Sequence, residues 1–234
     1  MELEIAVLHA PKRGSSEAEY EDAWHTEPIS SNVARLAVAD GASEAMLAGR
    51  WANELVRTFT DDVAGTAARA AKGWDAVVAE YVADREEREK PIRWYEEPGL
   101  ERGAYATLLG VEVRADGTFA ASAVGDSCLF QVRAGRLLLA FPIDDPAGFG
   151  SAPDLLPSRR LDPEKVAAVQ RQVSGAWQDG DVFHLATDAV AHWILAHGGP
   201  DGAAALTEGD IEGLRERGEL RDDDVTLVTA VVTG

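Results

Sequence analysis

Short apolar segments that end in a lone carboxylate are the feature that most constrains the fold of this chain. Residues 34–39, Ala-Arg-Leu-Ala-Val-Ala, have the pattern of a buried strand; Asp40 follows it, and Gly41 allows the backbone to turn sharply. A carboxylate buried in this way is costly unless a positive group meets it. Three further Asp residues stand beside predicted strands in a similar way: Asp22, Asp188 and Asp223. We therefore expect divalent metal ions to be held by carboxylates from distant parts of the chain.

Composition limits the partners. The 234 residues are 46% hydrophobic, enough for one sizeable core. With 41 acidic and 22 basic residues the net charge is −19, so we expect neither nucleic acid nor a membrane as partner, whereas metal ions are attracted. The single cysteine, Cys128, excludes a disulfide framework and a thiolate metal site. Residues 1–10 lack the pattern of a signal peptide and no stretch approaches the ~18 apolar residues of a membrane span, so the expected location is cytoplasmic.

Strands are predicted towards both ends of the chain. Two hairpins are expected within 104–142, around turns at 115–117 and 134–135. Further strands are expected at 4–9, 34–39, 171–177, 182–186 and 225–232. Many hairpins with a few grouped helices indicate an α+β sandwich and not alternating βαβ units. Because no long linker or internal repeat is present, we expect one domain over 1–234.

Helices are predicted mainly in the middle of the chain. The helix expected over 43–60 has one apolar face, formed by Leu47, Trp51, Leu55 and Phe59. A second is expected over 66–90, ended by Pro91, and shorter helices over 188–197 and 210–217. Residues 144–163 are rich in Pro, Asp, Gly and Ser, which predicts a long surface loop flanking the site.

Five short motifs follow one another along the chain. They are E-Y-E-D-A-W (19–24), V-A-D-G (38–41), S-A-V-G-D-S (122–127), D-G-D-V-F-H-L-A-T-D (179–188) and D-D-D-V-T-L-V (222–228). Together they resemble the metal-dependent Ser/Thr protein phosphatases of type 2C, the PPM family, as in a divergent bacterial-type member. The resemblance implies a four-layer αββα sandwich, in which two antiparallel β-sheets pack face to face between helices. It places a binuclear metal site at one edge of the sandwich, and makes 1–234 a single phosphatase-like catalytic domain.

The resemblance also assigns roles to single residues. Asp40 matches the carboxylate that bridges two metal ions, and Gly41 offers its carbonyl oxygen to one of them. Asp188 and Asp223 match further ligands of the other ion. Asp126, together with Asp188, matches a weaker third-ion site. The acidic pair that orients metal-bound water corresponds to Glu21 and Asp22.

The expected cofactor is Mn²⁺ or Mg²⁺, with two ions in the main site and a third in the weaker one, because these hard ions prefer carboxylate, carbonyl and water oxygens. Two ions ~3.5–4 Å apart can deprotonate a bridging water and hold phosphate oxygens. The resemblance implies a phosphoprotein phosphatase that hydrolyses phosphoserine or phosphothreonine by attack of the metal-bridging hydroxide, without a phosphoenzyme. Its expected partner is a phosphorylated protein, a Ser/Thr kinase or its target in bacterial signalling.

Features that bind substrate in the family are less well kept. Where the family usually has an Arg before the acidic pair, this chain has Glu17, and the nearest bases are Lys12 and Arg13. Either would serve if the loop is longer; Arg13 is our candidate to bind the phosphate, beside Asp40 and Asp22 as catalytic residues. Other departures from the family pattern stand at Ala42, Ala106, Cys128, Ala189 and Asp224.

Other interpretations remain open. The absence of the family's Arg, and the presence of Ala189 where the family has Gly, favour a phosphatase-like domain with weak or no turnover. Such a domain would act as a regulatory or phosphopeptide-binding module. A metal-stabilised structural domain is a third hypothesis. A single strand-end Asp is more often a turn or helix cap than a ligand, and Asp126 suits a turn equally well. Cys128, five residues before Arg133, lies in an apolar segment that does not resemble a phosphate-binding loop, so we expect a buried thiol.

Overall fold

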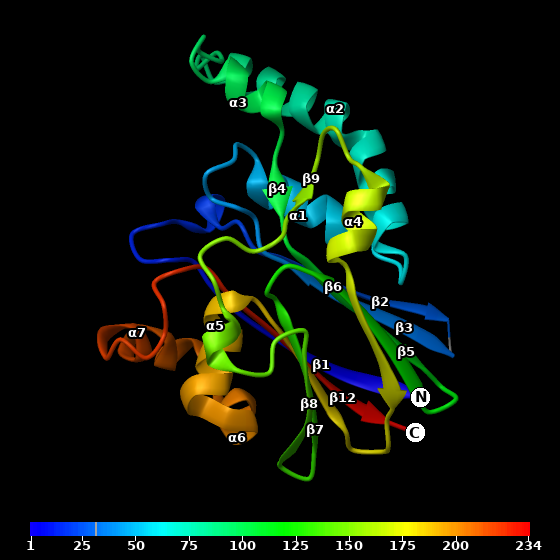
Figure 1. Cartoon of the computed structure of the whole chain (residues 1–234). Coiled ribbons are helices and arrows are strands. Elements are labelled where there is room, and N and C mark those ends of the chain that lie inside the picture. Colours follow the sequence, from blue (N-terminus) through cyan, green and yellow to red (C-terminus); the bar gives the residue numbers. More distant parts are fainter. Residues whose placement is uncertain (31) are drawn as a thin grey trace.

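Two five-stranded antiparallel sheets form the centre of the molecule (Figure 1), which a computed structural model describes for residues 1–30 and 32–234. The first sheet has the order β1 (Glu2–Ala10), β12 (Val225–Thr233), β11 (Val182–Ala186), β7 (Cys128–Arg133) and β8 (Arg136–Phe141). The second has the order β10 (Arg171–Ala176), β6 (Thr118–Val124), β5 (Leu108–Arg114), β3 (Val33–Ala39) and β2 (Ala23–Ser30). A separate two-stranded sheet pairs β4 (Tyr105–Ala106) with β9 (Leu156–Pro157).

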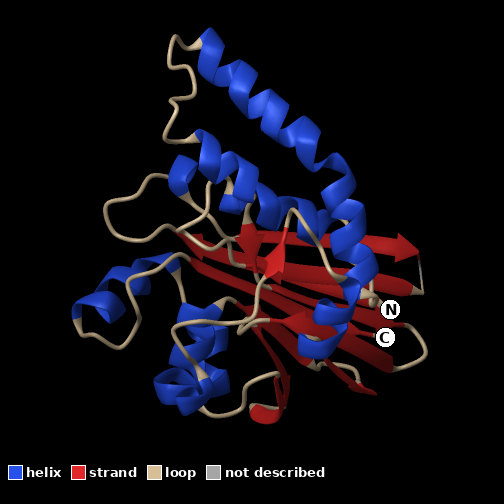
Figure 2. Ribbon diagram, turned by 45° about the horizontal axis from the view of Figure 1, so that its top comes forward, coloured by secondary structure: helices blue, strands red, loops and turns tan. Residues whose placement is uncertain are grey.

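Helices cover the outer faces of both sheets (Figure 2). Over the second sheet lie α1 (Ala48–Arg57) and α2 (Val63–Glu87), with α3 (Glu97–Arg102) and α4 (Pro163–Val169) next to them. The first sheet is covered by α5 (Asp188–Trp193), its π-helical continuation Ile194–Gly198, α6 (Gly199–Ala205) and α7 (Glu208–Glu216). Short 3₁₀ turns occupy Glu17–Glu19 and Pro146–Gly148. The four-layer α+β sandwich expected from the resemblance is therefore confirmed.

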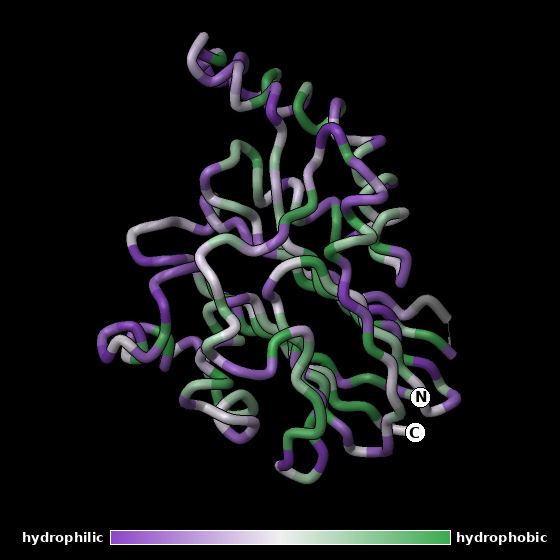
Figure 3. Tube along the Cα trace, viewed as in Figure 1, coloured by the Kyte–Doolittle hydropathy of each residue, from purple (hydrophilic) through white to green (hydrophobic). Residues whose placement is uncertain are grey.

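Buried apolar residues form three clusters, one at each interface between these layers. Hydrophobic residues are accordingly frequent along the trace of the central strands (Figure 3). Between the sheets, Phe119 of β6 meets Phe183 of β11 edge to face at 5.0 Å between ring centroids. On the outer side of the second sheet, the predicted apolar face of α1 buries Trp51 and Leu55 completely. Burial of such large side chains contributes about 1.5–3 kcal/mol each, which fixes the layers against each other.

Several elements differ from the sequence prediction. α1 begins at Ala48 instead of residue 43, because residues 42–47 form turns and Leu47 adopts a left-handed φ of 64°. The strand β2 was not expected, since Pro28 interrupts its pattern; it is an edge strand, where a missing N–H is tolerated. Three helices were also missed, each only six or seven residues long with Pro in the first turn: α3, α4 and α6.

The chain crosses between the two sheets at two short turns. The turn at 125–127 leads from β6 of the second sheet to β7 of the first, and the turn at 178–181 leads from β10 to β11. Antiparallel pairing places the end of β3, the start of β5 and the end of β6 at one edge. The end of β11 and the start of β12 lie together in the other sheet. Strand ends of both sheets therefore surround one region.

Among the residues that the structure describes, no helix combines the length and apolar character needed to cross a membrane.

Candidate metal centre

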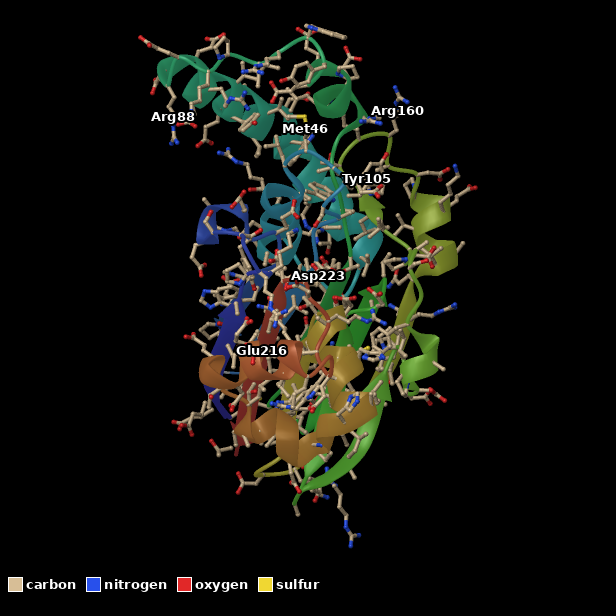
Figure 4. The ribbon with its side chains drawn as sticks, turned by 90° about the vertical axis from the view of Figure 1, so that its left-hand side faces the viewer. Met46, Arg88, Tyr105, Arg160, Glu216 and Asp223 are labelled. Carbon is tan, nitrogen blue, oxygen red and sulfur yellow. The ribbon has the colours of Figure 1, made fainter. Side chains whose placement is uncertain are left out.

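Carboxylates from four distant segments line one cavity of about 560 Å³ at this edge of the sandwich. Its lining includes five of the residues singled out from the sequence: Asp40, Gly41, Asp126, Asp188 and Asp223. Figure 4 shows Asp223 at the centre of the molecule in this view, above the C-terminal helices. Residues 150–153, from the loop expected to flank the site, line the same cavity. The structure thus brings together acidic side chains that lie up to 183 positions apart (Asp40 to Asp223).

The backbone after β3 is held in place by its neighbours. Asp40 N–H donates to Thr107 Oγ1 at 3.0 Å, and Thr107 N–H donates to the Asp40 carbonyl at 2.8 Å. At Gly41, a Cβ atom would come within 2.7 Å of the Glu21 carbonyl oxygen and the Ala48 carbonyl carbon. Real Cβ atoms do not approach backbone atoms so closely, so glycine alone allows α1 and the acidic pair to pack here.

Asp22 lies buried behind the cavity, with 3% of its surface exposed. Its Oδ2 accepts hydrogen bonds from Thr187 Oγ1 (2.8 Å), directly after β11, and from Thr226 Oγ1 (2.7 Å) in the neighbouring strand β12. Burial raises the pKa of Asp22 well above its ordinary value; the two hydroxyl groups oppose this rise, and Asp224 and Asp188 add to it. The acidic pair is therefore tied to the segments that carry Asp188 and Asp223.

Burial and neighbouring carboxylates disfavour the charged forms of three lining residues. Burial, followed by repulsion from Asp22, Asp188, Asp223 and Asp126, raises the pKa of Asp40 well above its ordinary value. Burial raises the pKa of Asp126 to about 6, with Asp188 the next cause. The pKa of Asp188 is also raised, by burial and then by Asp223, although Arg221 lowers it. Raised pKa values of several carboxyl groups in one cavity are typical of functional sites, and a bound cation would favour the charged forms again.

Few positive groups approach these carboxylates in the described part of the chain. Arg221 lines the cavity and donates from Nη1 to Asp188 Oδ2 at 3.2 Å. Lys12 Nζ donates to Glu21 Oε2 (3.2 Å) and to Oγ of the lining residue Ser43 (2.9 Å). Arg13, our sequence candidate for phosphate binding, is not among the lining residues; its Nε contacts Glu212 Oε1 on α7 at 2.8 Å.

Sequence reasoning missed the residues that arrange this region. Arg221 had an available signal, since it directly precedes the 222–224 acidic run. Arg215 of α7 gave none, because only the fold brings its side chain to the Asp223 carbonyl (2.6 Å) and the Pro11 carbonyl (3.0 Å). Cys128 is buried as expected, and burial raises its pKa to about 12, so it is inert as a nucleophile.

The donor set fits hard divalent cations. All candidate ligands are carboxylate or carbonyl oxygens, and Asp126 Oδ1 is buried without a hydrogen-bond partner among the described residues. Within 1–30 and 32–234, however, no three acidic, histidine or cysteine side chains are already arranged as ligands of one ion. Binding of a divalent cation would thus bring the carboxylates closer together, because the positive charge of the ion offsets their mutual repulsion.

No protein-family model matches the sequence, and no curated protein has a sequence that is significantly similar to it. Solved structures do match over nearly the whole chain. The photosystem II phosphatase PBCP is 17% identical with a TM-score of 0.61, covering 99% of both chains. The catalytic domain of the serine/threonine protein phosphatase PstP in complex with two manganese ions is 16% identical, with a TM-score of 0.56 and 99% of both chains covered. RsbX in complex with magnesium is 16% identical, with a TM-score of 0.52, covering 99% of this chain and 96% of RsbX. At these identities the likeness establishes the fold.

Proposed function

We propose that this chain is a metal-dependent phosphoprotein phosphatase acting on phosphoserine and phosphothreonine. The observation that carries the proposal is the gathering of Asp40, Asp126, Asp188 and Asp223 in one cavity, where burial and neighbouring carboxylates raise the pKa of the first three. The shared fold with PstP and RsbX, which hold manganese and magnesium, supports the same conclusion.

In this proposal Asp40 and the Gly41 carbonyl oxygen hold two Mn²⁺ or Mg²⁺ ions in a binuclear centre, with Asp188 and Asp223 as further ligands. Asp126 and Asp188 hold a weaker third ion. When bound, such ions lower the pKa of water to supply a nucleophile at neutral pH and neutralise the charge on phosphate oxygens. Asp22 and Glu21 orient water in the cavity, and Asp22 is preset for this by its two threonine hydrogen bonds.

Arg221 is the chain's own group for binding the substrate phosphate. It lines the cavity beside Asp188, and a guanidinium suits the oxygens of a phosphoryl group. Lys12 is a weaker candidate, because Glu21 and Ser43 already engage its ammonium group. Arg13 would serve only if its contact with Glu212 were broken.

Phosphate release tests the proposal directly. With excess Mn²⁺, the protein should hydrolyse p-nitrophenyl phosphate and a phosphothreonine peptide, and Asp40→Asn should reduce the rate by about 100-fold or more. Asp144→Asn removes the same charge from an exposed position outside the cavity and serves as the matched control. Activity of the unmodified protein no higher than that of Asp40→Asn would refute the enzyme hypothesis.

A phosphopeptide-binding module without turnover is the second candidate, and one observation favours it. Arg221 already pairs with Asp188, and Ala189 stands where the family has glycine, so an ion has to compete for this ligand. Calorimetry separates the candidates: a binding module takes up Mn²⁺ and a phosphopeptide with no release of phosphate.

The proposal treats 1–234 as one catalytic domain acting in the cytoplasm on a phosphorylated protein, a Ser/Thr kinase or its target. The strongly acidic surface supports the absence of nucleic acid and anionic membrane from its partners.

A further inference from the structure

A second cavity of about 510 Å³ runs between α3, β9 and α4. Four basic residues line it against two acidic ones, in a chain whose net charge is −19. The basic residues are Arg102, Arg159, Arg160 and Lys165, and the acidic ones are Asp154 and Asp162. We call this cavity the basic groove. Its charge is opposite to that of the molecule as a whole, which points to a negatively charged ligand.

Most of the positive charge in the basic groove is not neutralised by any residue that the structure describes. Arg102 and Arg160 are exposed and have neither an ion pair nor a hydrogen bond to any described residue. Lys165 approaches Asp162 only to 3.8 Å and its side chain is 85% exposed. The Nη2 of Arg159 contacts an exposed aspartate, but its Nε is buried without a partner in the described chain. The donors of Arg102, Arg160 and Lys165 are therefore available to a ligand.

The walls of the basic groove are fixed. Ser158 N–H donates to the Ala104 carbonyl (2.9 Å), and Ala104 N–H donates to Ser158 Oγ (2.8 Å), which holds the end of β9 to the start of β4. Trp51 of α1 donates from Nε1 to the Leu156 carbonyl at 2.8 Å. Arg160 follows in a left-handed conformation (φ 55°) that non-glycine residues rarely adopt, and Figure 4 shows its side chain extending outward.

The basic groove continues into the metal cavity. A smaller cavity of about 310 Å³ lies between them. It shares Ala42 and Glu44 with the metal cavity and Arg102 and Tyr105 with the basic groove, and Leu155 lines all three. In Figure 4, Tyr105 lies between Asp223 and Arg160. A chain that enters the metal cavity can thus extend past Tyr105 into the basic groove.

We propose that the basic groove binds acidic residues that flank the phosphorylated residue of a protein substrate. This inference rests on the proposed phosphatase function and specifies its substrate class. Leu155, Pro157 and Val166 supply apolar surface for the peptide, while the cations supply selectivity for Asp and Glu. The net charge of −19 disfavours an acidic peptide on the molecule as a whole, so the groove is where such a peptide is favoured.

The first test compares phosphothreonine peptides that carry acidic or neutral residues on either side of the phosphothreonine. We expect a higher kcat/KM for an acidic peptide, and a loss of that preference at high ionic strength because exposed charges are screened. Combined Arg102→Glu, Arg160→Glu and Lys165→Glu should lower the acidic-to-neutral ratio of kcat/KM by about tenfold or more. Arg136→Glu, which reverses an exposed cation on β8 outside the groove, should leave the ratio as in the unmodified protein. Arg160→Glu alone should give a smaller drop and guards against misfolding of the triple variant.

The second test needs no turnover. A fluorescently labelled acidic peptide without phosphate should bind the metal-free protein, measured by anisotropy, and bind the triple variant at least about tenfold more weakly. If p-nitrophenyl phosphate is hydrolysed but acidic and neutral peptides react equally, the groove proposal is overturned while the phosphatase proposal stands. If nothing is hydrolysed, the phosphatase proposal fails, and the anisotropy result alone decides the groove. Equal binding by both proteins, or none, overturns it.

Discussion

Replacing Asp126 by Asn should stabilise the metal-free protein at neutral pH. Asp126 lies in the turn that crosses from β6 to β7, is 5% exposed, and has an Oδ1 atom without a hydrogen-bond partner in the described chain. Burial and the neighbouring Asp188 both disfavour its charged form. Asparagine keeps the shape of the side chain and removes the charge, so the repulsion disappears.

The size and sign of this effect follow from the pKa. In the folded protein the pKa of Asp126 rises from its ordinary 3.8 to about 6. On unfolding the carboxyl loses its proton more readily, so its contribution to stability falls as the pH rises from about 4 to about 6. The full difference corresponds to about 3 kcal/mol above that range, or roughly 6–12 °C in Tm for a chain of this length.

The assay is denaturant unfolding of the unmodified protein and Asp126→Asn in EDTA, at neutral pH and near pH 4. The variant should be more stable at neutral pH, and the difference should shrink as the pH falls to about 4, because the folded carboxyl is then protonated and the unfolded one is close to its own pKa of 3.8. Asp144→Asn, an exposed change of the same kind, should shift neither curve. With Mn²⁺ added, the unmodified protein should gain more stability than Asp126→Asn, because the ion binds the folded state.

Equal or lower stability of Asp126→Asn in EDTA at neutral pH would refute the reasoning. It would mean that the carboxylate is already compensated in the folded protein, so the cavity would not be a site in need of cations.

Two further predictions concern the same cavity. Gly41→Ala should lower the free energy of unfolding by about 1–3 kcal/mol, because its Cβ would overlap backbone atoms of Glu21 and Ala48; thermal melts check this, and Gly73→Ala in α2, where space is open, should be neutral or slightly stabilising. Arg221→Ala should raise KM for p-nitrophenyl phosphate about tenfold through the lost contact to phosphate, with Arg221→Lys intermediate; an unchanged KM in steady-state kinetics would remove Arg221 from the phosphate site.

The acidic half of the site could be predicted because strand ends are legible in a sequence. An apolar run such as 34–39 predicts where a buried strand ends, and Asp40 and Gly41, which follow it, are expected at the edge of the sheet. The short helices and β2 gave too little periodicity to be read, because packing and not local propensity holds them. The basic groove was equally invisible, since α3, β9 and α4 meet only in the fold.

The cation proposed to bind phosphate could not be predicted by matching single residues to the family pattern. Asp224, one of the departures from the family pattern, accepts hydrogen bonds through its carboxylate from the backbone N–H groups of Lys12 (2.8 Å) and Glu21 (2.7 Å). That arrangement ties the 11–21 loop to the start of β12, and Arg13 N–H is similarly bound to Asp222 at 3.0 Å. With the loop held from behind, the Arg13 side chain meets α7, and the cation that lines the cavity comes from position 221 instead. The proposed metal ligands and the proposed phosphate contact can therefore diverge separately, because the former depend on strand ends of the core and the latter depends on surface loops.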